Sequence, residues 1–553
     1  MSLSGCDNIG MPTAVPAPSS TVAEQSRLAS AGMAQTLRSQ ALAIESLQRD
    51  NDELKRQVAW FKRQVFGRKS ERFAPLPDAQ QMHLGEVLGQ EVAASPEAAQ
   101  DNRTQTVPAH QRRKPRSNFA DDEGSLTPFF DASKVPVETI EVRSAEQQAL
   151  ADDQYEVIGH KTSWRLAQRP GSYVVIQYVR PLIKRLDEQT LHCATAPCGV
   201  FEGSRADVSF IAGLLIDKFV YHLPLYRQHQ RLLDAGLKLS RPWLTQLVQR
   251  AAQLLEAIYE AQLASIVNGR VIAMDETPIK AGLAAPGKMK ATYFWPVYGE
   301  RDEVCFPHFE SRRHEHVAQV LGLSPEAGTV LLSDGYGAYA SFAKKTGIQH
   351  AQCWVHMRRM FFEAQDAEPQ AAAQALSQIG ALYKIEEDIR QAGLTGQAKH
   401  LHRLTHSKPH VDRFFEWIEH QFAQQGLLPS NPLTKALAYA RERRSGLEIF
   451  LKDADVPMDT NHLERALRAI PMGRRNWLFC WTEVGAQHAG IVQSLAVTCR
   501  LHGIDPYTYF VDVLQRVGQH PAARVAALTP RLWKQHFADN PLRSDLYRAG
   551  DTL

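Results

Sequence analysis

The sequence contains few cysteines and has no long apolar run. Its seven cysteines lie far apart, at positions 6, 193, 198, 305, 353, 480 and 499, which excludes a small disulfide-stabilised scaffold. No stretch of about eighteen apolar residues is present, and the N-terminus lacks the basic start and apolar core of a signal peptide. These absences predict a cytoplasmic protein with no membrane partner.

A strong charge of one sign is also absent. The chain has 63 Lys and Arg against 60 Asp and Glu, a net charge of +3, so composition alone does not indicate a nucleic-acid-binding protein. Seven basic residues nevertheless lie between Lys55 and Arg72, against the single acid Glu71. Phosphate binding depends on such a local excess. A second basic stretch, residues 110–116, fits a DNA-phosphate contact and a merely solvated segment equally well.

With 553 residues, the chain is too long for one core and predicts several domains. Composition and periodicity divide it as follows: 1–24, disordered; 25–73, a coiled coil with a basic segment; 74–135, linker; 136–205, a small β module; 206–268, helical and helix-turn-helix-like; 269–368 and 453–517, an α/β core; 369–452, a long helical insertion; 518–553, a tail.

Apolar residues repeat every seven positions near the N-terminus. One seam contains Leu37, Ile44, Val58 and Val65, with Asn51 at the middle position, and Leu47, Leu54 and Phe61 fill the second seam. This pattern predicts a coiled coil of about four heptads that pairs two chains, giving a homodimer or a higher oligomer. The alternative is an amphipathic helix packed on its own chain.

The helical region 206–268 contains a tight connection around Gly236 and a second helix start at Ser240, with Ser as the cap and Pro242 in the first turn. This spacing suits a helix-turn-helix, and a helical hairpin without DNA fits it as well. In the first interpretation the side chains available to a major groove are Arg241, Gln246, Gln249 and Arg250.

Three separated acids could form one metal-binding group. Asp275 follows the apolar run Val271–Met274, and Asp334 follows Val330–Ser333, so each is expected at the end of a buried strand; Glu464 lies in a basic helix. Three carboxylates can hold two divalent ions, and a pair about 4 Å apart suits phosphoryl transfer. Taken singly, a strand-end acid is better explained as a turn or cap residue.

The surroundings of Asp275 predict an α/β sheet covered by helices. Residues 292–298 and 303–309 are apolar and aromatic runs that should pair as antiparallel strands, and a helix is expected over about 314–321. Side chains alternate along a strand, so Glu276 should point away from the face that Asp275 occupies. Asp275 is therefore the expected ligand of the two.

Five ordered motifs carry a resemblance to a known family. They are Asp275-Glu276-Thr277-Pro278, Ser333-Asp334-Gly335-Tyr336, the cysteine-to-arginine stretch 353–359, Asn461-His462-Leu463-Glu464-Arg465, and residues 473–479. In this order they resemble the large transposase of the bacterial insertion-sequence-66 family, closely over about 207–516 and more weakly before residue 73. The resemblance implies a DDE enzyme with a ribonuclease-H-like core whose catalytic residues and metal ligands are Asp275, Asp334 and Glu464.

The resemblance also implies cofactors and partners. Two Mg²⁺ ions per site are expected, with Mn²⁺ as a substitute, and DNA is expected as both element ends and target. Members of this family are usually encoded with small accessory proteins. The residues expected to contact DNA are His356, Arg358, Arg359, Arg465, Arg468, Arg474, Arg475 and Trp477.

Some of these roles have alternatives or depart from the family pattern. Glu464 and Arg468 also have the spacing of an ordinary surface ion pair. The family usually has a zinc ribbon in the β module, but only Cys193 and Cys198 are present here, so zinc is not expected. The usual Asp-Asn-Asn before the third acid is Asp459-Thr460-Asn461 in this chain, which leaves the role of position 460 open.

The sequence thus predicts a DNA transposase that cleaves and joins strands with divalent metal. Two other functions use the same features: a structure-selective nuclease on the same core, and a DNA-binding regulator derived from a transposase. The paired coiled coil and the helix-turn-helix favour paired, site-specific binding over the nuclease. The intact acid triad favours an active enzyme over the regulator.

Overall fold

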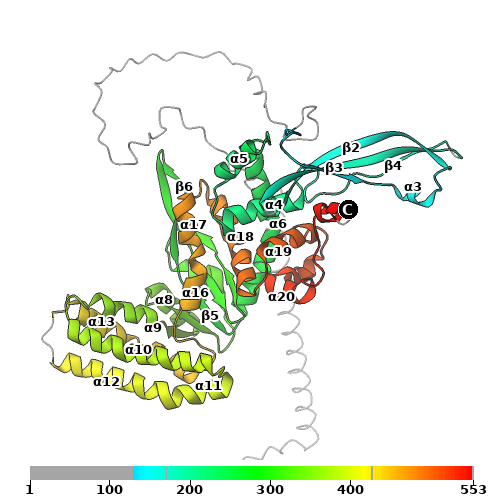
Figure 1. Cartoon of the computed structure of the whole chain (residues 1–553). Coiled ribbons are helices and arrows are strands. Elements are labelled where there is room, and N and C mark those ends of the chain that lie inside the picture. Colours follow the sequence, from blue (N-terminus) through cyan, green and yellow to red (C-terminus); the bar gives the residue numbers. More distant parts are fainter. Residues whose placement is uncertain (1–128, 170, 188, 425–427, 551–553) are drawn as a thin grey trace, which may run out of the picture. The chain divides into compact units, whose positions relative to one another are not determined.

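The structure is a computed structural model that describes residues 129–169, 171–187, 189–424 and 428–550 (Figure 1). The predicted disordered start, the coiled coil, both basic stretches and nearly all of the linker therefore lie outside the described residues. Within the described part the fold is mixed α/β. The ribonuclease-H-like character of the core remains a prediction from the resemblance.

The predicted small β module is built on a long hairpin. Strands β2 (Tyr155–Arg169) and β3 (Ser172–Arg185) pair antiparallel, β1 (Val137–Glu141) pairs parallel with β3, and β4 (Leu191–Cys193) pairs antiparallel with β3. The short helix α3 (Ala145–Ala149) follows β1. Cys193 and Cys198 are free thiols, half-buried and exposed respectively.

The helices predicted for 206–268 are present. They are α4 (Val208–Leu215), the π-helix η2 (Ile216–Val220), α5 (Leu225–Asp234) and α6 (Arg241–Val267). The Ser240 side chain caps α6 by accepting from the Trp243 amide, and Gly236 has a φ of 88°, in the region where glycine is favoured. The local turn and cap are therefore confirmed.

One proposed groove contact on α6 is wrong. Gln249 is 4% exposed, because this face of α6 packs into the core rather than facing solvent. Arg241, Gln246 and Arg250 are exposed, although the Arg250 guanidinium lies 4.1 Å from the centre of the Phe201 ring. The 27-residue helix α6 is buried along one side, so its main structural role is to pack in the core.

The central sheet has the strand order β12-β11-β5-β8-β9. Strands β5 (Val271–Met274), β11 (Val330–Ser333) and β12 (Gln349–Gln352) are parallel, whereas β8 (Val297–Gly299) and β9 (Glu303–Cys305) join the sheet antiparallel. Every residue of β5 and β11 is buried, which agrees with sequences that are apolar except for Ser333 at the end of β11. The strands predicted before Asp275 and Asp334 are confirmed.

The antiparallel pairing predicted between 292–298 and 303–309 is confirmed, but it is divided between two sheets. β8 pairs with β9, while β7 (Lys288–Phe294) pairs with β10 (His308–Phe309). The second sheet, of order β10-β7-β6, contains β6 (Thr277–Ala285). Pro296, between β7 and β8, offers no amide hydrogen to continue a ladder, which fits a break at this point.

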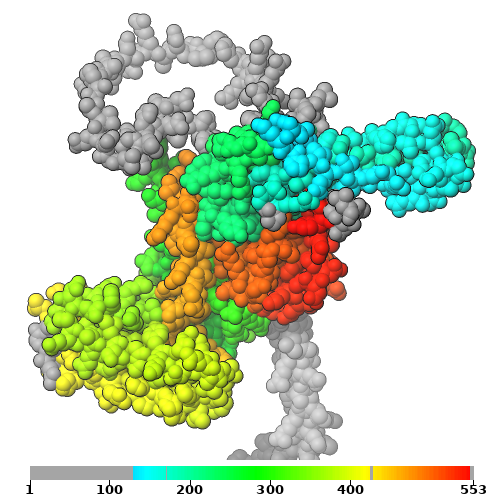
Figure 2. Space-filling view, in the orientation of Figure 1, coloured from blue at the N-terminus to red at the C-terminus, as the bar shows by residue number. Residues whose placement is uncertain are grey.

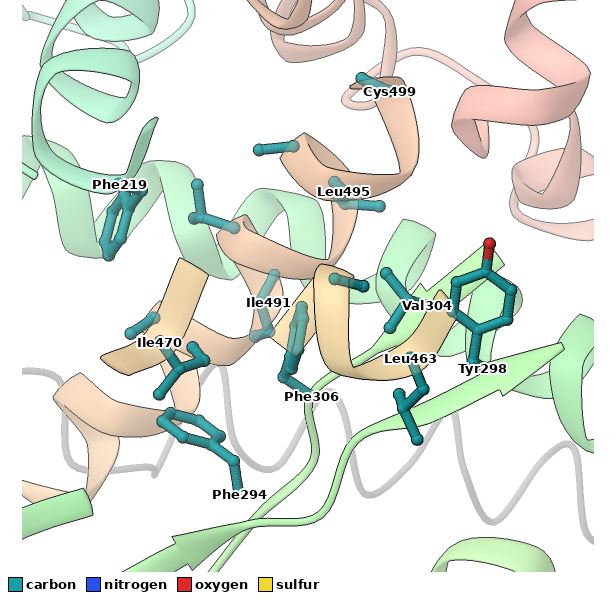
Figure 3. Close-up of a cluster of buried hydrophobic side chains, with 14 of the residues drawn as sticks. Phe219, Phe294, Tyr298, Val304, Phe306, Leu463, Ile470, Ile491, Leu495 and Cys499 are labelled. Carbon is teal, nitrogen blue, oxygen red and sulfur yellow. The ribbon is translucent and has the colours of Figure 1, made fainter. Parts of the chain in front are cut away.

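Helices cover both faces of the central sheet. Side chains that alternate along β5 divide between two core clusters: Ile272 and Met274 pack with α7 (Glu315–Leu321) and α8 (Gly337–Thr346), and Val271 and Ala273 belong to the larger cluster on the other face. That cluster includes Leu463 of α16 (Asn461–Leu467), Ile470 of α17 (Ala469–Trp477) and Leu495 of α18 (Glu483–Leu501), which Figure 3 shows around Phe294 and Phe306.

Residues 369–452, between the second and third acids, are helical, as predicted. After α9 (Trp354–Glu363) come α10 (Pro369–Gln391), α11 (Gly396–His402), the π-helix η3 (Arg403–Ser407), α12 (Lys408–Gln424), α13 (Pro432–Glu442), α14 (Arg444–Leu447) and α15 (Ile449–Lys452). Figure 2 shows the surface of this segment in yellow and yellow-green. We call residues 369–452 the helical segment.

The segment after residue 517, expected only as a tail, is folded. It contains η4 (Ala522–Leu528), α20 (Pro530–His536) and α21 (Asp545–Gly550), which follow α19 (Pro506–Arg516). Trp533 is 2% exposed and donates to the buried Asp512 at 2.9 Å. Apolar anchors this widely spaced give no periodic signal in a sequence, so the sequence did not predict this packing.

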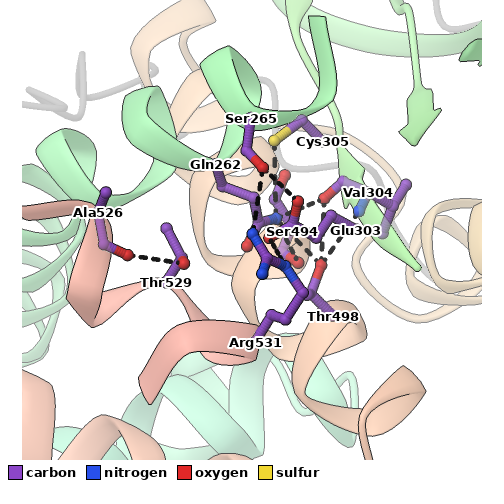
Figure 4. Close-up of polar contacts among 10 residues, drawn as sticks. All are labelled: Gln262, Ser265, Glu303, Val304, Cys305, Ser494, Thr498, Ala526, Thr529 and Arg531. Atoms are coloured by element: carbon purple, nitrogen blue, oxygen red, sulfur yellow. Dashed lines mark hydrogen bonds and ion pairs between the residues drawn. The ribbon is translucent and has the colours of Figure 1, made fainter. Parts of the chain in front are cut away.

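A buried polar network joins α6, α18 and α20 to β9, the edge strand of the central sheet (Figure 4). Gln262 donates to the Val304 carbonyl at 2.8 Å and to the Thr498 hydroxyl at 3.0 Å. The carboxylate of Glu303, 1% exposed, accepts from Ser265 at 2.6 Å and from Arg531 at 3.0 Å. Buried polar groups need such partners, so this network fixes the helices that support the sheet.

No helix in the described part of the chain is long and apolar enough to cross a membrane.

Candidate active site

Two of the three predicted acids meet because their strands are neighbours. β5 and β11 are parallel, with Ala273 opposite Leu332, so the residues that follow the two strands emerge at the same edge of the sheet. Asp275 and Asp334 are those residues. This is the usual position of functional groups in an open α/β sheet, beyond the carboxyl ends of the strands.

The third acid reaches the same edge from α16. Its position depends on a contact between the start of α16 and the start of α9: Thr460 is 1% exposed, and its amide and hydroxyl lie 3.3 and 3.2 Å from the sulfur of the buried Cys353. The Trp354 amide also donates to the Met458 carbonyl at 3.2 Å. Position 460, which departs from the family pattern, therefore joins the two helices.

The structure gathers the acids into two groups that share one member. Among the described residues, ligand atoms of Asp275, Glu276 and Asp334 lie within 4.8 Å of one another, and so do those of Asp275, His356 and Glu464. Neither group contains both Asp334 and Glu464. Asp275 is thus the common carboxylate, with the other two predicted acids in separate groups beside it.

The environment of Asp275 disfavours its negative charge. Burial raises the pKa of its carboxyl to about 7, and the nearby carboxylates of Glu276, Asp334 and Glu464 act in the same direction, against a hydrogen bond from the Glu276 amide at 2.8 Å. Carboxylates that repel one another in a partly buried place are stabilised by a bound cation. The site therefore has the electrostatics of a cation site.

Glu276 was expected to turn away from Asp275, and this prediction is only partly met. Its carboxylate accepts from the Tyr339 hydroxyl of α8 at 2.7 Å and pairs with Arg312, whose Nε lies 2.7 Å away. It still comes within 4.8 Å of Asp275, because β5 ends at Met274 and strict alternation no longer applies. Neither Tyr339 nor Arg312 was identified from the sequence.

Asp334 is held by the turn that follows it. Its Oδ1 accepts from the Tyr336 amide at 2.9 Å, and the Tyr336 ring lies 4.2 Å from the Arg312 guanidinium. On the other side, Arg443 of the helical segment donates to the Gly335 carbonyl at 3.4 Å. Arg443 lies 108 residues after Gly335, so no local sequence pattern connects this arginine with the turn that contains Asp334.

His356 lies beside the third acid. Its Nε2 is 3.7 Å from Oε1 of Glu464, and its side chain is 16% exposed. Its Nδ1 is buried and has no hydrogen-bond partner among the described residues. The alternative role of Glu464, a surface ion pair with Arg468, is not formed in the described structure, where the carboxylate of Glu464 instead lies near Nε2 of His356.

Most of the arginines expected to contact DNA occupy exposed positions. Arg358 and Arg359 of α9, Arg465 and Arg468 beside Glu464, and Arg475 of α17 are exposed. Leu463, Ala466 and Ile470 are buried, so the acid and its neighbouring arginines share the outer side of this helical stretch. These exposures are compatible with phosphate binding, which stays a prediction for each residue.

Arg474 and Trp477 differ from the other expected DNA contacts. Arg474 donates to the Pro278 carbonyl of β6 at 2.6 Å, so it joins α17 to the strand that follows Asp275. Trp477 is half-buried, and a Cβ at Gly473 would come within 2.6 Å of its Nε1. Both side chains therefore have a structural contact in addition to any role with DNA.

Comparison with known proteins identifies the family. Residues 203–488 match the model described as the IS66 family of transposases, residues 494–531 match the IS66 C-terminal element, and residues 53–122 match a model described as the transposase C homeodomain of IS166. Two similar proteins of Sinorhizobium fredii are uncharacterized. The protein y4hP is 28% identical over 515 residues, covering 88% of this chain and 89% of that protein. The protein y4qI is 30% identical over 394 residues, covering 68% and 71%.

The first of these matches spans more than half of the chain and contains Asp275, Asp334 and Glu464. The order of the motifs, the arrangement of the acids at one sheet edge and the family matches agree. This chain belongs to the IS66 family of transposases.

Proposed function

We propose that this transposase cleaves DNA at the ends of its element and joins them to target DNA, with Asp275, Asp334 and Glu464 as its catalytic acids. The observation that carries the proposal is the position of Asp275 between two ligand groups. One group would suffice for a single structural ion. Two groups with a common carboxylate suit a pair of ions on the two sides of a reacting phosphate.

The residues present fit divalent metal. Hard cations take carboxylate oxygens, and the mutual repulsion that raises the pKa of Asp275 would be relieved by a cation. Asp275 with Asp334 would hold one Mg²⁺ and Asp275 with Glu464 the other, and Mn²⁺ would substitute. When bound, such ions supply Lewis-acid activation of the attacking oxygen and charge stabilisation of the leaving one.

The remaining residues would orient the acids and the DNA. Tyr339 and Arg312 hold Glu276, which fixes the chain immediately after Asp275. The exposed arginines near the acids, Arg358, Arg359, Arg465, Arg468 and Arg475, would bind the phosphates that flank the scissile bond, with Arg474 and Trp477 contributing at the edge of α17. Phosphate contacts of this kind set the register of a protein on DNA without reading sequence.

We also propose the partners. DNA is the partner that a transposase family implies, and the match over residues 53–122 supports a DNA-binding region before the core. Holding two element ends together requires at least a dimer, for which the seven-residue repeat before residue 66 is the proposed interface. A cytoplasmic location and small accessory proteins remain part of the proposal.

The test is cleavage and joining of labelled DNA that carries the element's own ends, with and without Mg²⁺. We expect Asp275→Asn to abolish both products and to retain DNA binding, while Asp234→Asn, an exposed acid on α5, leaves both unchanged. Products from Asp275→Asn at the wild-type rate would refute the assignment. Cleavage without joining would indicate a structure-selective nuclease, and salt-dependent binding without either product would indicate a regulator.

A further inference from the structure

We propose that His356 is a ligand of the ion between Asp275 and Glu464, so that the two metal sites differ chemically. One site would present carboxylates alone, and the other two carboxylates and an imidazole nitrogen. The inference rests on the proposed function, since it assumes that these acids bind metal. It departs from the sequence interpretation, in which His356 was expected to contact DNA.

The distances place His356 within reach of a shared ion. Ligand atoms of His356, Asp275 and Glu464 lie within 4.8 Å of one another, and Nε2 of His356 is 3.7 Å from Oε1 of Glu464. Two ligands at about 2.1 Å from one ion are separated by at most about 4.2 Å. The His356–Glu464 pair already lies within that limit, and ligand atoms as far as 4.8 Å apart have to close by at least about 0.6 Å to share one ion.

The imidazole has no other assigned partner in the described structure. Its Nδ1 is buried and lacks a hydrogen bond, and the contact of Nε2 with Glu464 is longer than a hydrogen bond. A buried nitrogen without a partner calls for an explanation, and a missing ligand is one of the usual ones. A bound ion would use one ring nitrogen directly.

The scaffold holds His356 and Glu464 as a pair. Cys353, three residues before the histidine, contacts Thr460, four residues before the glutamate, and the Trp354 indole donates to the Leu447 carbonyl at 2.9 Å. The first contact fixes the start of α9 against the start of α16, and the second fixes it against α14. Preorganised ligands of this kind favour coordination over a loose phosphate contact.

Exposure separates His356 from the arginines next to it. Arg358 and Arg359 are exposed, whereas the His356 side chain is 16% exposed and lies against the acids. The two arginines can serve phosphates without the histidine. Imidazole nitrogen raises affinity for transition metals relative to Mg²⁺, so the site with His356 should prefer Mn²⁺ over Mg²⁺ more strongly than the all-carboxylate site does.

The experiment uses the full-length protein with Mn²⁺ and no DNA. Electron-spin-echo envelope modulation of bound Mn²⁺ detects a coordinated imidazole through its ¹⁴N coupling. We expect that coupling in the wild type, its loss in His356→Asn, and its retention in His160→Asn, which makes the same change at an exposed position on β2. Mn²⁺ titration should also show one site weakened at least tenfold in His356→Asn and the other unchanged.

A second measurement does not depend on the folding of a variant. Growth with histidine labelled with ¹⁵N in the ring should replace the ¹⁴N pattern by the ¹⁵N pattern in the unaltered chain. Bound Mn²⁺ with no nitrogen coupling, or coupling that persists in His356→Asn, would overturn the inference. If Asp275→Asn removes Mn²⁺ but no coupling is seen, only the inference fails; if Asp275→Asn binds Mn²⁺ like the wild type, the proposed function fails with it.

Discussion

The hydroxyl of Tyr439 would lie 2.5 Å from a Cβ at Gly335, the residue that follows Asp334. Arg443 Nε would lie 2.8 Å from the same atom. Gly335 does not have a left-handed backbone, so the absence of a side chain there serves close packing rather than an unusual φ. The helical segment, through α13 and Arg443, thus packs directly against the turn that carries the second acid.

Gly335→Ala should displace this turn or the side chains of Tyr439 and Arg443. A shift of about 1 Å at a catalytic carboxylate can reduce a rate by about a hundredfold, so we expect cleavage to fall by between ten- and a hundredfold. Gly337→Ala is the matched control, because a Cβ at that position meets nothing within 4 Å. Single-turnover cleavage of both variants is the measurement, and full activity in Gly335→Ala would show that the contact does not constrain Asp334.

Arg403→Met should destabilise the helical segment strongly. The guanidinium is 1% exposed, forms two 2.8 Å bonds with Glu386, and donates to main-chain carbonyls that include those of Phe450 and Val456. Removing one partner of a buried pair costs about 3–5 kcal/mol. Urea unfolding followed by circular dichroism would measure the loss.

Arg390→Met provides the control for that experiment. Arg390 is 69% exposed and pairs with Glu387 one turn away on the same helix, so its loss should cost less than about 0.5 kcal/mol. Equal effects of the two substitutions would contradict the structural role assigned to Arg403.

Acid should destabilise the fold through His308. Burial lowers the pKa of this histidine to about 4, below its ordinary value near 6.5, while Glu483 acts weakly in the opposite direction. The unfolded chain therefore binds a proton more readily than the folded one between pH 6.5 and 4. The contribution of neutral His308 to the free energy of unfolding is fully present above pH 6.5 and is lost as the pH falls towards 4.

His308→Gln removes this titration, so its unfolding midpoint should fall less between pH 7.5 and pH 5 than that of the wild type. The difference should be about 2 kcal/mol, because pH 5 lies about 1.5 units below the unfolded pKa and each unit contributes about 1.4 kcal/mol. Urea midpoints of both proteins at the two pH values are the measurement. Parallel losses in both proteins would show that other groups account for the acid sensitivity.

Arg474 and Arg475 should differ in what their removal changes. Neutralising one phosphate-binding side chain reduces the slope of log affinity against log salt by about 0.9, so Arg475→Ala should weaken DNA binding and lower that slope by about one. Arg474→Ala should also lower the thermal midpoint, because it removes the bond to the Pro278 carbonyl. Salt titrations of binding and melting curves of the two variants separate these effects, and an unchanged slope for Arg475→Ala would refute its phosphate contact.

Local patterns predicted the elements but not every neighbour of the site. The apolar runs before Asp275 and Asp334 and the cap at Ser240 depend on adjacent residues, so they could be read from the sequence and are confirmed. Tyr339 and Arg312 reach Glu276 from 63 and 36 residues away, and their positions depend on tertiary packing. No periodicity reports such contacts, which is why the sequence did not predict these partners.

The contact between Cys353 and Thr460 has a consequence for how this family can change. It closes a loop of 107 residues at its base, so the position of Glu464 does not have to be transmitted through the helices in between. Doubling the length of a closed loop costs only about 0.6 kcal/mol in chain entropy. Insertions and deletions in the helices far from this contact therefore cost little free energy. Members of the family can differ widely in these outer helices while Glu464 keeps its position.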